Sequence, residues 1–319
     1  MTTAARHVVV TGAGGFIGAK LARRLLDAPA FANDRITLGD LSLAGLPNHP
    51  RARRVEGDFG DAGVRDRLLD GRADIVFHLA GILGGAAEAD YDLARRVNVD
   101  ATLSLLEALR SSAAPPRVVF ASSIAVFGPG APDRIDDDTP PNPTMVYGAQ
   151  KRMIEVVLEQ FSARGWIDGL AIRLPGIVAR PGADARLKTA FLNAMFHAYA
   201  AGDDITLPVS PEGTTWMISV PACIDAFVHA GLLSADRIGA RRAFTLPAQR
   251  IAFGDLVAAL RRRFPNSPSA VRFEPQTDIE AQFARQPPLT TAIADALGFR
   301  HDGDLDTLVA RALSQETVA

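Results

Sequence analysis

The residues whose types and spacing most clearly suggest chemistry are Tyr147 and Lys151. They are four positions apart in a segment with a helical pattern, so both side chains lie on one face of the expected helix. Bringing a phenol pKa from near 10 to near 7 takes about 4 kcal/mol of preferential stabilisation of the phenolate, part of which an ammonium supplies. Tyr147 is therefore predicted to be a general base toward an alcohol or a general acid toward a carbonyl. The alternative is an aromatic core residue beside a solvated lysine.

A serine pair follows the apolar run 117–121. Ser122 and Ser123 are expected at the carboxyl end of a strand, where open α/β sheets bind their ligands. A hydroxyl at this position can orient a substrate oxygen, although serines are also common in turns. Together with Tyr147 and Lys151, Ser123 is the candidate for the catalytic contact.

A glycine cluster lies between an expected strand at 7–11 and an expected helix at 19–28. Gly12 permits a tight turn, Gly15 lets the backbone approach a pyrophosphate, and Gly18 lets the helix pack closely on the strand. Because the cluster directly follows a strand and directly precedes a helix, it predicts a dinucleotide site with the phosphates at the helix N-terminus. The alternative is a tight strand-to-helix turn that binds nothing.

Two aspartates follow at positions that suit the adenosine half of such a cofactor. Asp40 ends the second expected strand, where an acidic side chain can accept hydrogen bonds from both ribose hydroxyls and would repel a 2′-phosphate. No arginine comes directly after it, so the cofactor is predicted to be NAD rather than NADP. Asp58 follows a possible third strand and is a candidate for the adenine amino group, although aspartate is common in turns.

These residues must be positioned by elements that alternate along the first half of the chain. Strands are expected at 7–11, 35–40, 75–79, 117–121 and 169–174, and helices at 19–28, 90–110 and 147–164. Short apolar runs separated by helical patterns are typical of a parallel sheet covered on both faces. The fold class is therefore predicted to be α/β, with a doubly wound parallel sheet.

The pattern loosens after Pro175, where prolines separate short elements. We expect a cofactor-binding domain at 1–175, to which 216–247 returns. The remaining segments, 176–215 and 248–319, are expected to form a smaller, interrupted substrate domain.

The composition excludes several classes of protein. Hydrophobic residues make up 48% and charged residues 22%, and the formal charge is −2 without a basic patch, so a disordered chain and a nucleic-acid partner are not expected. The single Cys223 fits a reducing compartment. The start of the sequence lacks a signal-peptide pattern, and no apolar run reaches about 18 residues. We expect a cytoplasmic protein without a membrane partner.

The motifs together resemble the extended short-chain dehydrogenase/reductase superfamily, which includes NAD-dependent epimerases and dehydratases. The resemblance rests on residues 11–18, 78–81, 122–123 and 147–151 with Asp58 and Asn98. It implies a Rossmann-type fold, with Ser123 orienting the carbonyl, Tyr147 as the acid/base and Lys151 as its ribose-binding partner. The cofactor site that it implies is formed by Gly12, Gly15, Phe16, Ile17, Gly18, Asp40, Asp58, Phe59, Leu79, Ala80, Asn98, Tyr147, Lys151, Pro175, Ile177 and Val178.

Four stretches, at 88–93, 123–128, 136–139 and 173–175, are most similar to the D-erythronate dehydrogenase subfamily. Sugar-nucleotide epimerases typically carry an Asn where this chain has Gly176, and a diphosphate-binding Arg where it reads 215–218 Thr-Trp-Met-Ile. The resemblance therefore implies a small substrate rather than a sugar diphosphate. The substrate that it implies is most simply D-erythronate, oxidised at its C2 hydroxyl. Besides Ser123 and Tyr147, the candidates for binding this substrate are Arg180, Arg186, Lys188 and Trp216. The alternative is a solvated charge for each of the cations and a core residue for Trp216.

Two alternatives use the same residues. One is a nucleotide-sugar epimerase that retains its NAD, and the other is a non-catalytic NAD-sensing protein. The remaining histidines show no metal spacing and His78 is expected to pack beneath the cofactor loop, so no metal is predicted. The resemblance also implies a homodimer that pairs the helices expected at 90–110 and 147–164.

Overall fold

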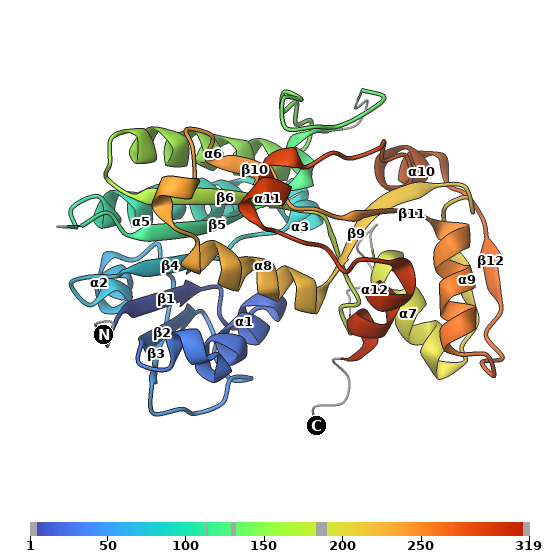
Figure 1. Ribbon diagram of the computed structural model, residues 1–319, viewed down its shortest axis with the longest axis horizontal. Coiled ribbons are helices and arrows are strands. Elements are labelled where there is room, and N and C mark those ends of the chain that lie inside the picture. Colours follow the sequence, from blue (N-terminus) through green and yellow to red (C-terminus); the bar gives the residue numbers. More distant parts are fainter. Residues whose placement is uncertain (1–4, 113, 129–131, 183–189, 315–319) are drawn as a thin grey trace. The chain divides into compact units, whose positions relative to one another are not determined.

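The computed structural model describes residues 5–112, 114–128, 132–182 and 190–314 (Figure 1). The chain forms two compact units, each with its own sheet and core. The first comprises 1–126, 141–173 and 224–244, and the second comprises 127–140, 174–223 and 245–319. The expected segment 216–247 is shared, because 224–244 belongs to the first unit, whereas 216–223 and 245–247 belong to the second. Which unit binds cofactor and which binds substrate stays a prediction.

The first unit is built on a seven-stranded sheet in the order β10-β6-β5-β4-β1-β2-β3. The pairs that join β5, β4, β1, β2 and β3 are parallel. The order 3-2-1-4-5-6 within this sheet is that of a doubly wound Rossmann fold, which confirms the predicted fold class. The strands are β1 (His7–Thr11), β2 (Arg35–Asp40), β3 (Ala52–Glu56), β4 (Ile75–His78), β5 (Arg117–Ser123), β6 (Asp168–Leu174) and β10 (Ala243–Thr245).

Helices cover both faces of this sheet because successive residues of a buried strand point to opposite sides. Val76 of β4 belongs to the core formed with α2, α5 and α6, whereas the ring of the next residue, Phe77, lies against Gly231 of α8. The helical elements are α1 (Phe16–Asp27), η1 (Pro29–Phe31), α2 (Ala62–Leu69), α3 (Gly84–Ala89), α4 (Tyr91–Arg95), η2 (Arg96–Ala101), α5 (Thr102–Leu109), η3 (Ile124–Val126), α6 (Val146–Ala163), α8 (Val220–Leu232) and η4 (Ala235–Arg237).

Two elements differ from the sequence-based expectation. The single helix expected at 90–110 is three consecutive pieces, α4, the π-helical turn η2 and α5. A π turn inserts one residue into the helical ladder, which the hydrophobic period does not reveal. Strand β5 extends two residues beyond the expected 117–121 and includes Ser122 and Ser123. Their side chains therefore point to opposite faces of the sheet.

The second unit is built on a three-stranded sheet in the order β11-β9-β7, together with the pair β12-β8. Strand β9 pairs antiparallel with β11 and parallel with β7. Helices α7, α9 and α12 bury their apolar faces in one core with residues of this sheet. The elements are β7 (Gly176–Val178), α7 (Phe191–Ala201), β8 (Ile205–Leu207), β9 (Thr214–Ser219), β11 (Gln249–Ala252), α9 (Phe253–Arg263), β12 (Val271–Phe273), α10 (Thr277–Phe283), α11 (Ala292–Leu297) and α12 (Leu305–Leu313).

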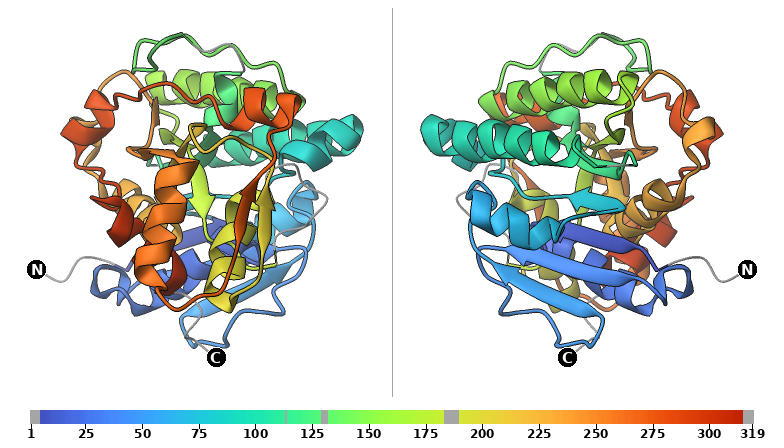
Figure 2. Two further views of the ribbon diagram at one scale, coloured as in Figure 1. Left: turned by 90° about the vertical axis from the view of Figure 1, so that its right-hand side faces the viewer. Right: turned by 90° about the vertical axis from the view of Figure 1, so that its left-hand side faces the viewer.

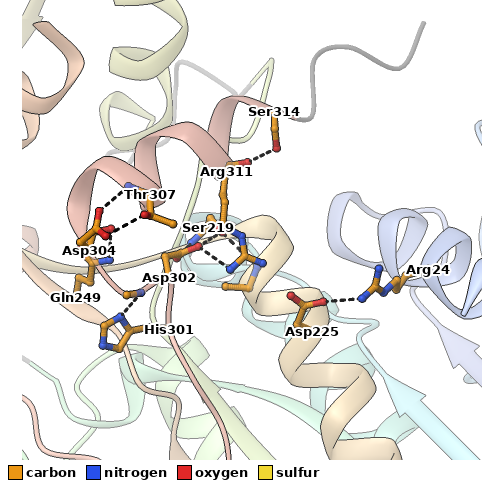
Figure 3. Close-up of polar contacts among 12 residues, drawn as sticks. Arg24, Ser219, Asp225, Gln249, His301, Asp302, Asp304, Thr307, Arg311 and Ser314 are labelled. Carbon is orange, nitrogen blue, oxygen red and sulfur yellow. Dashed lines mark hydrogen bonds and ion pairs between the residues drawn. The ribbon is translucent and has the colours of Figure 1, made fainter. Parts of the chain in front are cut away.

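Asp302 is the centre of a buried polar cluster in the second unit (Figure 3). Its carboxylate accepts hydrogen bonds from the backbone N–H of Ser219 at 2.8 Å and from the Ser219 hydroxyl at 2.5 Å, and it lies 3.3 Å from the guanidinium of Arg311. A buried carboxylate is costly unless it is paired in this way. The cluster therefore fastens α12 to the end of β9, where α8 begins.

Among the residues that the structure describes, no helix combines the length and the apolar character needed to cross a membrane.

Candidate active site

Ser123, Tyr147 and Lys151 come together at the carboxyl end of β5. Ser123 is the last residue of β5, Tyr147 is the second residue of α6, and Lys151 follows one turn later. The Ser123 side chain lies close enough to the Tyr147 phenol to lower its pKa. The Lys151 ammonium lies 5.5 Å from the centroid of the Tyr147 ring and 4.6 Å from that of Phe120. The arrangement places a hydroxyl, a phenol and an ammonium where an alcohol or a carbonyl can react.

Burial sets the protonation of these groups. It raises the pKa of Tyr147 to about 12, while the Ser123 side chain acts in the opposite direction. It lowers the pKa of Lys151 to about 8, while the charge of Glu155 acts in the opposite direction. The phenol is thus protonated in the free protein. Action as a base requires further positive charge beside the ring, which an oxidised nicotinamide would add.

The glycine turn between β1 and α1 fits the pyrophosphate of a dinucleotide. Gly12 has φ +72°, and a Cβ there would lie 2.6 Å from the backbone nitrogen of Ala80. A Cβ on Gly18 would lie 1.9 Å from the carbonyl oxygen of Gly12, so only a glycine at this position lets α1 pack this closely on the turn. A Cβ on Gly15 would meet one atom within 4 Å, the Gly12 oxygen, which leaves its other side open for a phosphate.

The start of α1 suits an anion as well. Gly15 is the N-cap residue of α1, and no side chain forms a capping hydrogen bond at this described helix end. The first turn, which includes Phe16 and Ile17, has no acidic residue. The residues of α1 themselves therefore place no negative charge at the positive end of the helix dipole.

The two predicted aspartates are held differently. Asp40 accepts hydrogen bonds from the backbone N–H of Gly14 at 2.9 Å and of Leu41 at 2.7 Å, so its carboxylate is fixed beside the glycine turn. Asp58 accepts a hydrogen bond from the backbone N–H of Gly60 and forms an ion pair at 2.5 Å with Arg96. These contacts hold the pKa of Asp58 below its usual range.

The loop after β4 is tied to α6 by Asn98. The Asn98 side chain accepts from the N–H of Ile82 at 2.7 Å and donates to the Ile82 carbonyl at 3.0 Å and to Oε1 of Gln150 at 2.8 Å. A Cβ on Gly81 would lie 3.1 Å from Asn98 Oδ1 and 3.5 Å from Lys151 Nζ. Leu79 donates its N–H to the carbonyl of the last β1 residue. The predicted Leu79 and Ala80 therefore lie against the glycine turn, and Asn98 lies at Gly81, which is close to Lys151.

His78 packs beneath this loop, as the sequence predicts. It is 1% exposed, with Thr11 Oγ1 at 2.6 Å from Nδ1 and Thr102 Oγ1 at 2.9 Å from Nε2. Its ring packs between those of Phe59 and Phe120. Burial, with the Lys151 charge as a second cause, lowers the pKa of His78 to about 3, so the ring is neutral. Within the described ranges, no three side chains of His, Cys, Asp or Glu are grouped to hold a metal ion.

The other predicted residues belong to the second unit. Ile177 and Val178 are in β7, Pro175 precedes it, and the backbone N–H of Arg180 donates to Asn193 at 2.7 Å. The Trp216 side chain is 1% exposed and its indole N–H donates to the Pro287 carbonyl at 2.8 Å. Trp216 is thus part of the packing of β9. Their contacts with cofactor or substrate stay predictions, and Arg186 and Lys188 lie outside the described residues.

Sequence reasoning missed the buried partners of this site. Glu155, which is 0% exposed, accepts hydrogen bonds from the Ser122 hydroxyl and from Arg173. The amide nitrogen of Gln150 is buried without a hydrogen-bond partner in the structure. Glu155 was detectable as an acidic residue on the apolar face of α6, one turn after Lys151. A charge at such a position requires a partner.

The chain is similar to known proteins over most of its length. Residues 8–228 match the NAD dependent epimerase/dehydratase family. A D-erythronate dehydrogenase from Cupriavidus necator is 36% identical over 312 residues, which cover 95% of this chain and 96% of that protein. One from Haemophilus influenzae is 31% identical over 305 residues, which cover 95% and 97%.

A solved structure shows the same fold. It is described as a nucleoside-diphosphate-sugar epimerase from Agrobacterium tumefaciens and matches with a TM-score of 0.86 at 31% identity, covering 96% of this chain and 92% of that one. The resemblance inferred from the motifs is confirmed. The chain belongs to the NAD dependent epimerase/dehydratase family within the extended short-chain dehydrogenases/reductases, and it is an oxidoreductase that acts on CH–OH groups.

Proposed function

We propose that this enzyme oxidises the C2 hydroxyl of D-erythronate to the 2-keto acid with NAD as the oxidant. The observation that carries the oxidoreductase chemistry is the Lys151 ammonium 5.5 Å from the centroid of the Tyr147 ring, at the start of α6 and beside Ser123 at the end of β5. The choice of D-erythronate rests on the two similar D-erythronate dehydrogenases, which align over 95% of the chain.

The structure of the second unit supports a small substrate over a sugar diphosphate. A Cβ on Gly176 would lie 2.8 Å from the carbonyl oxygen of Trp216, so the Asn expected of nucleotide-sugar epimerases does not fit without a backbone shift. Residues 215–218, where those enzymes carry a diphosphate-binding Arg, are all buried in β9 and are uncharged. Neither position presents a cationic side chain to a diphosphate.

In the proposed reaction, Ser123 orients the substrate oxygen and Tyr147 removes the hydroxyl proton. The Lys151 ammonium stabilises the phenolate that Tyr147 must form. The chemistry that NAD supplies when bound is the acceptance of a hydride from the substrate carbon. The glycine turn and the start of α1 would hold its pyrophosphate, and Asp40 its adenosine ribose.

The surroundings of Asp40 favour NAD over NADP. Its carboxylate would repel a 2′-phosphate, and the nearby arginines of β3 contact protein acceptors. Arg53 forms an ion pair at 3.1 Å with Asp70, and Arg54 donates to the Leu46 carbonyl at 3.1 Å. We therefore expect kcat/KM with NAD to exceed that with NADP at least about tenfold, which is about 1.4 kcal/mol.

The test is nicotinamide reduction by the purified protein with D-erythronate, other four-carbon aldonates, simple 2-hydroxy acids and secondary alcohols. Rapid NADH formation with D-erythronate is expected. Tyr147→Phe should lower kcat about 100-fold or more while NAD binding is kept. The matched control is Tyr91→Phe, which removes the same hydroxyl from a side chain that is 56% exposed. Near-normal activity of Tyr147→Phe would remove the proposed base.

If the enzyme binds NAD but no acid or alcohol of this panel reduces the NAD to NADH, the proposed reaction is contradicted. If such a protein also copurifies with NAD and binds sugar diphosphates, the epimerase alternative would replace the proposal. If it binds NAD alone, the sensor alternative would.

We also propose a homodimer formed through α4, α5 and α6. Helices α5 and α6 lie side by side, which Figure 2 shows as adjacent teal and green helices. These helices expose several large apolar side chains, which a second copy would cover. The exposed side chains are Tyr91, Leu103, Met153 and Val156.

The buried Cys223 is the single cysteine of the sequence, which supports a reducing, cytoplasmic location.

A further inference from the structure

Glu155 of α6 connects this helix, which carries Tyr147 and Lys151, to strand β5, which carries Ser123, and to strand β6. Its Oε1 accepts from the Ser122 hydroxyl at 2.6 Å and from Arg173 Nε at 2.9 Å, and its Oε2 accepts from Arg173 Nη2 at 2.9 Å and from Arg152 Nη1 at 3.1 Å. Ser122 belongs to β5, Arg173 to β6 and Arg152 to α6. The bidentate pair with Arg173 fixes the orientation of the carboxylate.

The position of Ser122 makes this contact relevant to Ser123. Neighbouring residues of a strand point to opposite faces, so Ser122 faces Glu155 in the core while Ser123 faces Tyr147. A hydrogen bond that holds Ser122 therefore holds the end of β5 from behind. A sub-ångström displacement of Ser123 would change the geometry in which a substrate oxygen must lie.

Glu155 also faces Lys151 along α6. Residues 147, 151 and 155 lie one helical turn apart on the same face of α6, and both Lys151 and Glu155 are buried. Among the described residues, the titratable groups that contact or influence Lys151 include Tyr147 and Glu155 from α6 and His78 from β4. Arg152 of α6 and Arg173 of β6 face the Glu155 carboxylate as its hydrogen-bond donors. Of these, Glu155 is the one whose negative charge opposes the effect of burial on the pKa of Lys151.

We propose that Glu155 is a positioning residue for the reaction, which fixes Ser123 through Ser122 and places a negative charge one helical turn from Lys151. The residue touches neither substrate nor cofactor and acts through its neighbours. Its relevance to turnover rests on the proposed function, whereas its effect on Lys151 is a property of the free protein.

The experiment that isolates the effect on Lys151 uses the small number of lysines in this chain. Lys20, Lys151 and Lys188 are the three lysines of the sequence, so protein labelled with carbon-13 at the lysine ε position gives a simple spectrum. The Lys151 signal is assigned by its loss in Lys151→Arg. In Glu155→Gln its titration midpoint should fall by about one pH unit or more, a tenfold change in the protonation equilibrium.

The matched control is Asp168→Asn. Asp168 forms the same kind of partly buried network with Arg117 and Arg242, at 2.5 and 2.6 Å. It begins β6, five residues and about 16 Å of strand before Arg173. This variant should leave the Lys151 midpoint and the pH profile of kcat unchanged.

Turnover separates the two roles of Glu155. Ser122→Ala removes the contact with β5 and keeps the charge, so kcat should fall about tenfold while the Lys151 midpoint is kept. Glu155→Gln should in addition move the alkaline limb of the kcat profile to lower pH. If Glu155→Gln does not fold, the double variant Glu155→Gln/Arg173→Met removes the stranded cation and carries the same test.

A folded Glu155→Gln protein whose Lys151 midpoint stays within about 0.3 pH units of wild type would overturn the electrostatic role. A Ser122→Ala enzyme with wild-type kcat would overturn the positioning role. A wild type that oxidises none of the hydroxy acids rejects the proposed function instead, and the lysine titration still decides the inference because it needs no substrate.

Discussion

Replacement of His78 by Gln is expected to flatten the dependence of stability on pH. The folded-state pKa of His78 is about 3 and its ordinary value is 6.5, so between these pH values the unfolded chain binds one more proton than the folded chain. Stability that is present above pH 6.5 is therefore lost as the pH falls, by about 1.4 kcal/mol per unit. Because the unfolded histidine is only half protonated at pH 6.5, the loss from this one residue between pH 6.5 and 4.5 is about 2.3 kcal/mol.

The hydrogen bonds of His78 set the size of the effect at neutral pH. Thr102 Oγ1 donates to the Val97 carbonyl and therefore accepts from Nε2, which leaves Nδ1 to accept from Thr11. Gln at position 78 cannot satisfy both threonines, so stability at pH 7.5 should fall by about 1–3 kcal/mol. Because Gln does not titrate, the gap between wild type and variant should narrow as the pH is lowered.

The assay is denaturant unfolding at several pH values between 7.5 and 4.5, followed by fluorescence. Trp166 is in the first unit and Trp216 in the second, so a Trp216→Phe background reports on the unit that contains His78. Thr11→Val is the matched control, since it removes one hydrogen bond and keeps the titrating ring. It should lose a similar stability at pH 7.5 and keep the wild-type slope. A His78→Gln protein with the wild-type slope would refute the argument.

Three further outcomes are expected. Gly18→Ala puts a Cβ 1.9 Å from a backbone oxygen and should weaken NAD binding, measured by fluorescence titration, at least about tenfold. In the control Gly45→Ala the new Cβ meets no atom within 4 Å, so the dissociation constant of NAD should be unchanged. Asp40→Ser combined with Leu41→Arg should move the kcat/KM preference toward NADP by about tenfold or more, and an unchanged ratio would contradict the role of Asp40. Met153→Glu, at a side chain that is 52% exposed, should give a monomer by light scattering if α6 is at the dimer interface, and a monomeric wild type would reject that interface.

The glycine turn and the Tyr147–Lys151 pair could be recognised without a structure because each is a local pattern. Gly12, Gly15 and Gly18 are seven residues from first to last, and their steric roles follow from the strand before them and the helix after them. The alternation of apolar runs with helical patterns was sufficient to predict a doubly wound parallel sheet, since parallel strands with crossover helices have few arrangements. The family followed from motifs of this kind.

Other features depended on contacts between distant segments. The π turn that carries Asn98 differs from a regular helix by one inserted residue, and its contacts with Ile82 and Gln150 join positions 16 and 52 residues apart. Trp216 was a candidate for substrate binding because of its residue type. Only the folded second unit reveals that its indole N–H donates a hydrogen bond to the Pro287 carbonyl. No local pattern specifies such partners.

What the sequence by itself determined is therefore the fold class and the groups available for chemistry, because backbone conformation and helical spacing are encoded in neighbouring residues. What only the tertiary structure decided is the protonation and support of those groups. The neutral state of His78, the opposing effects on Lys151 and the Glu155–Arg173 pair all arise from burial beside particular partners. Desolvation and Coulomb energies depend on which strands and helices become neighbours, and that is settled when the sheet assembles.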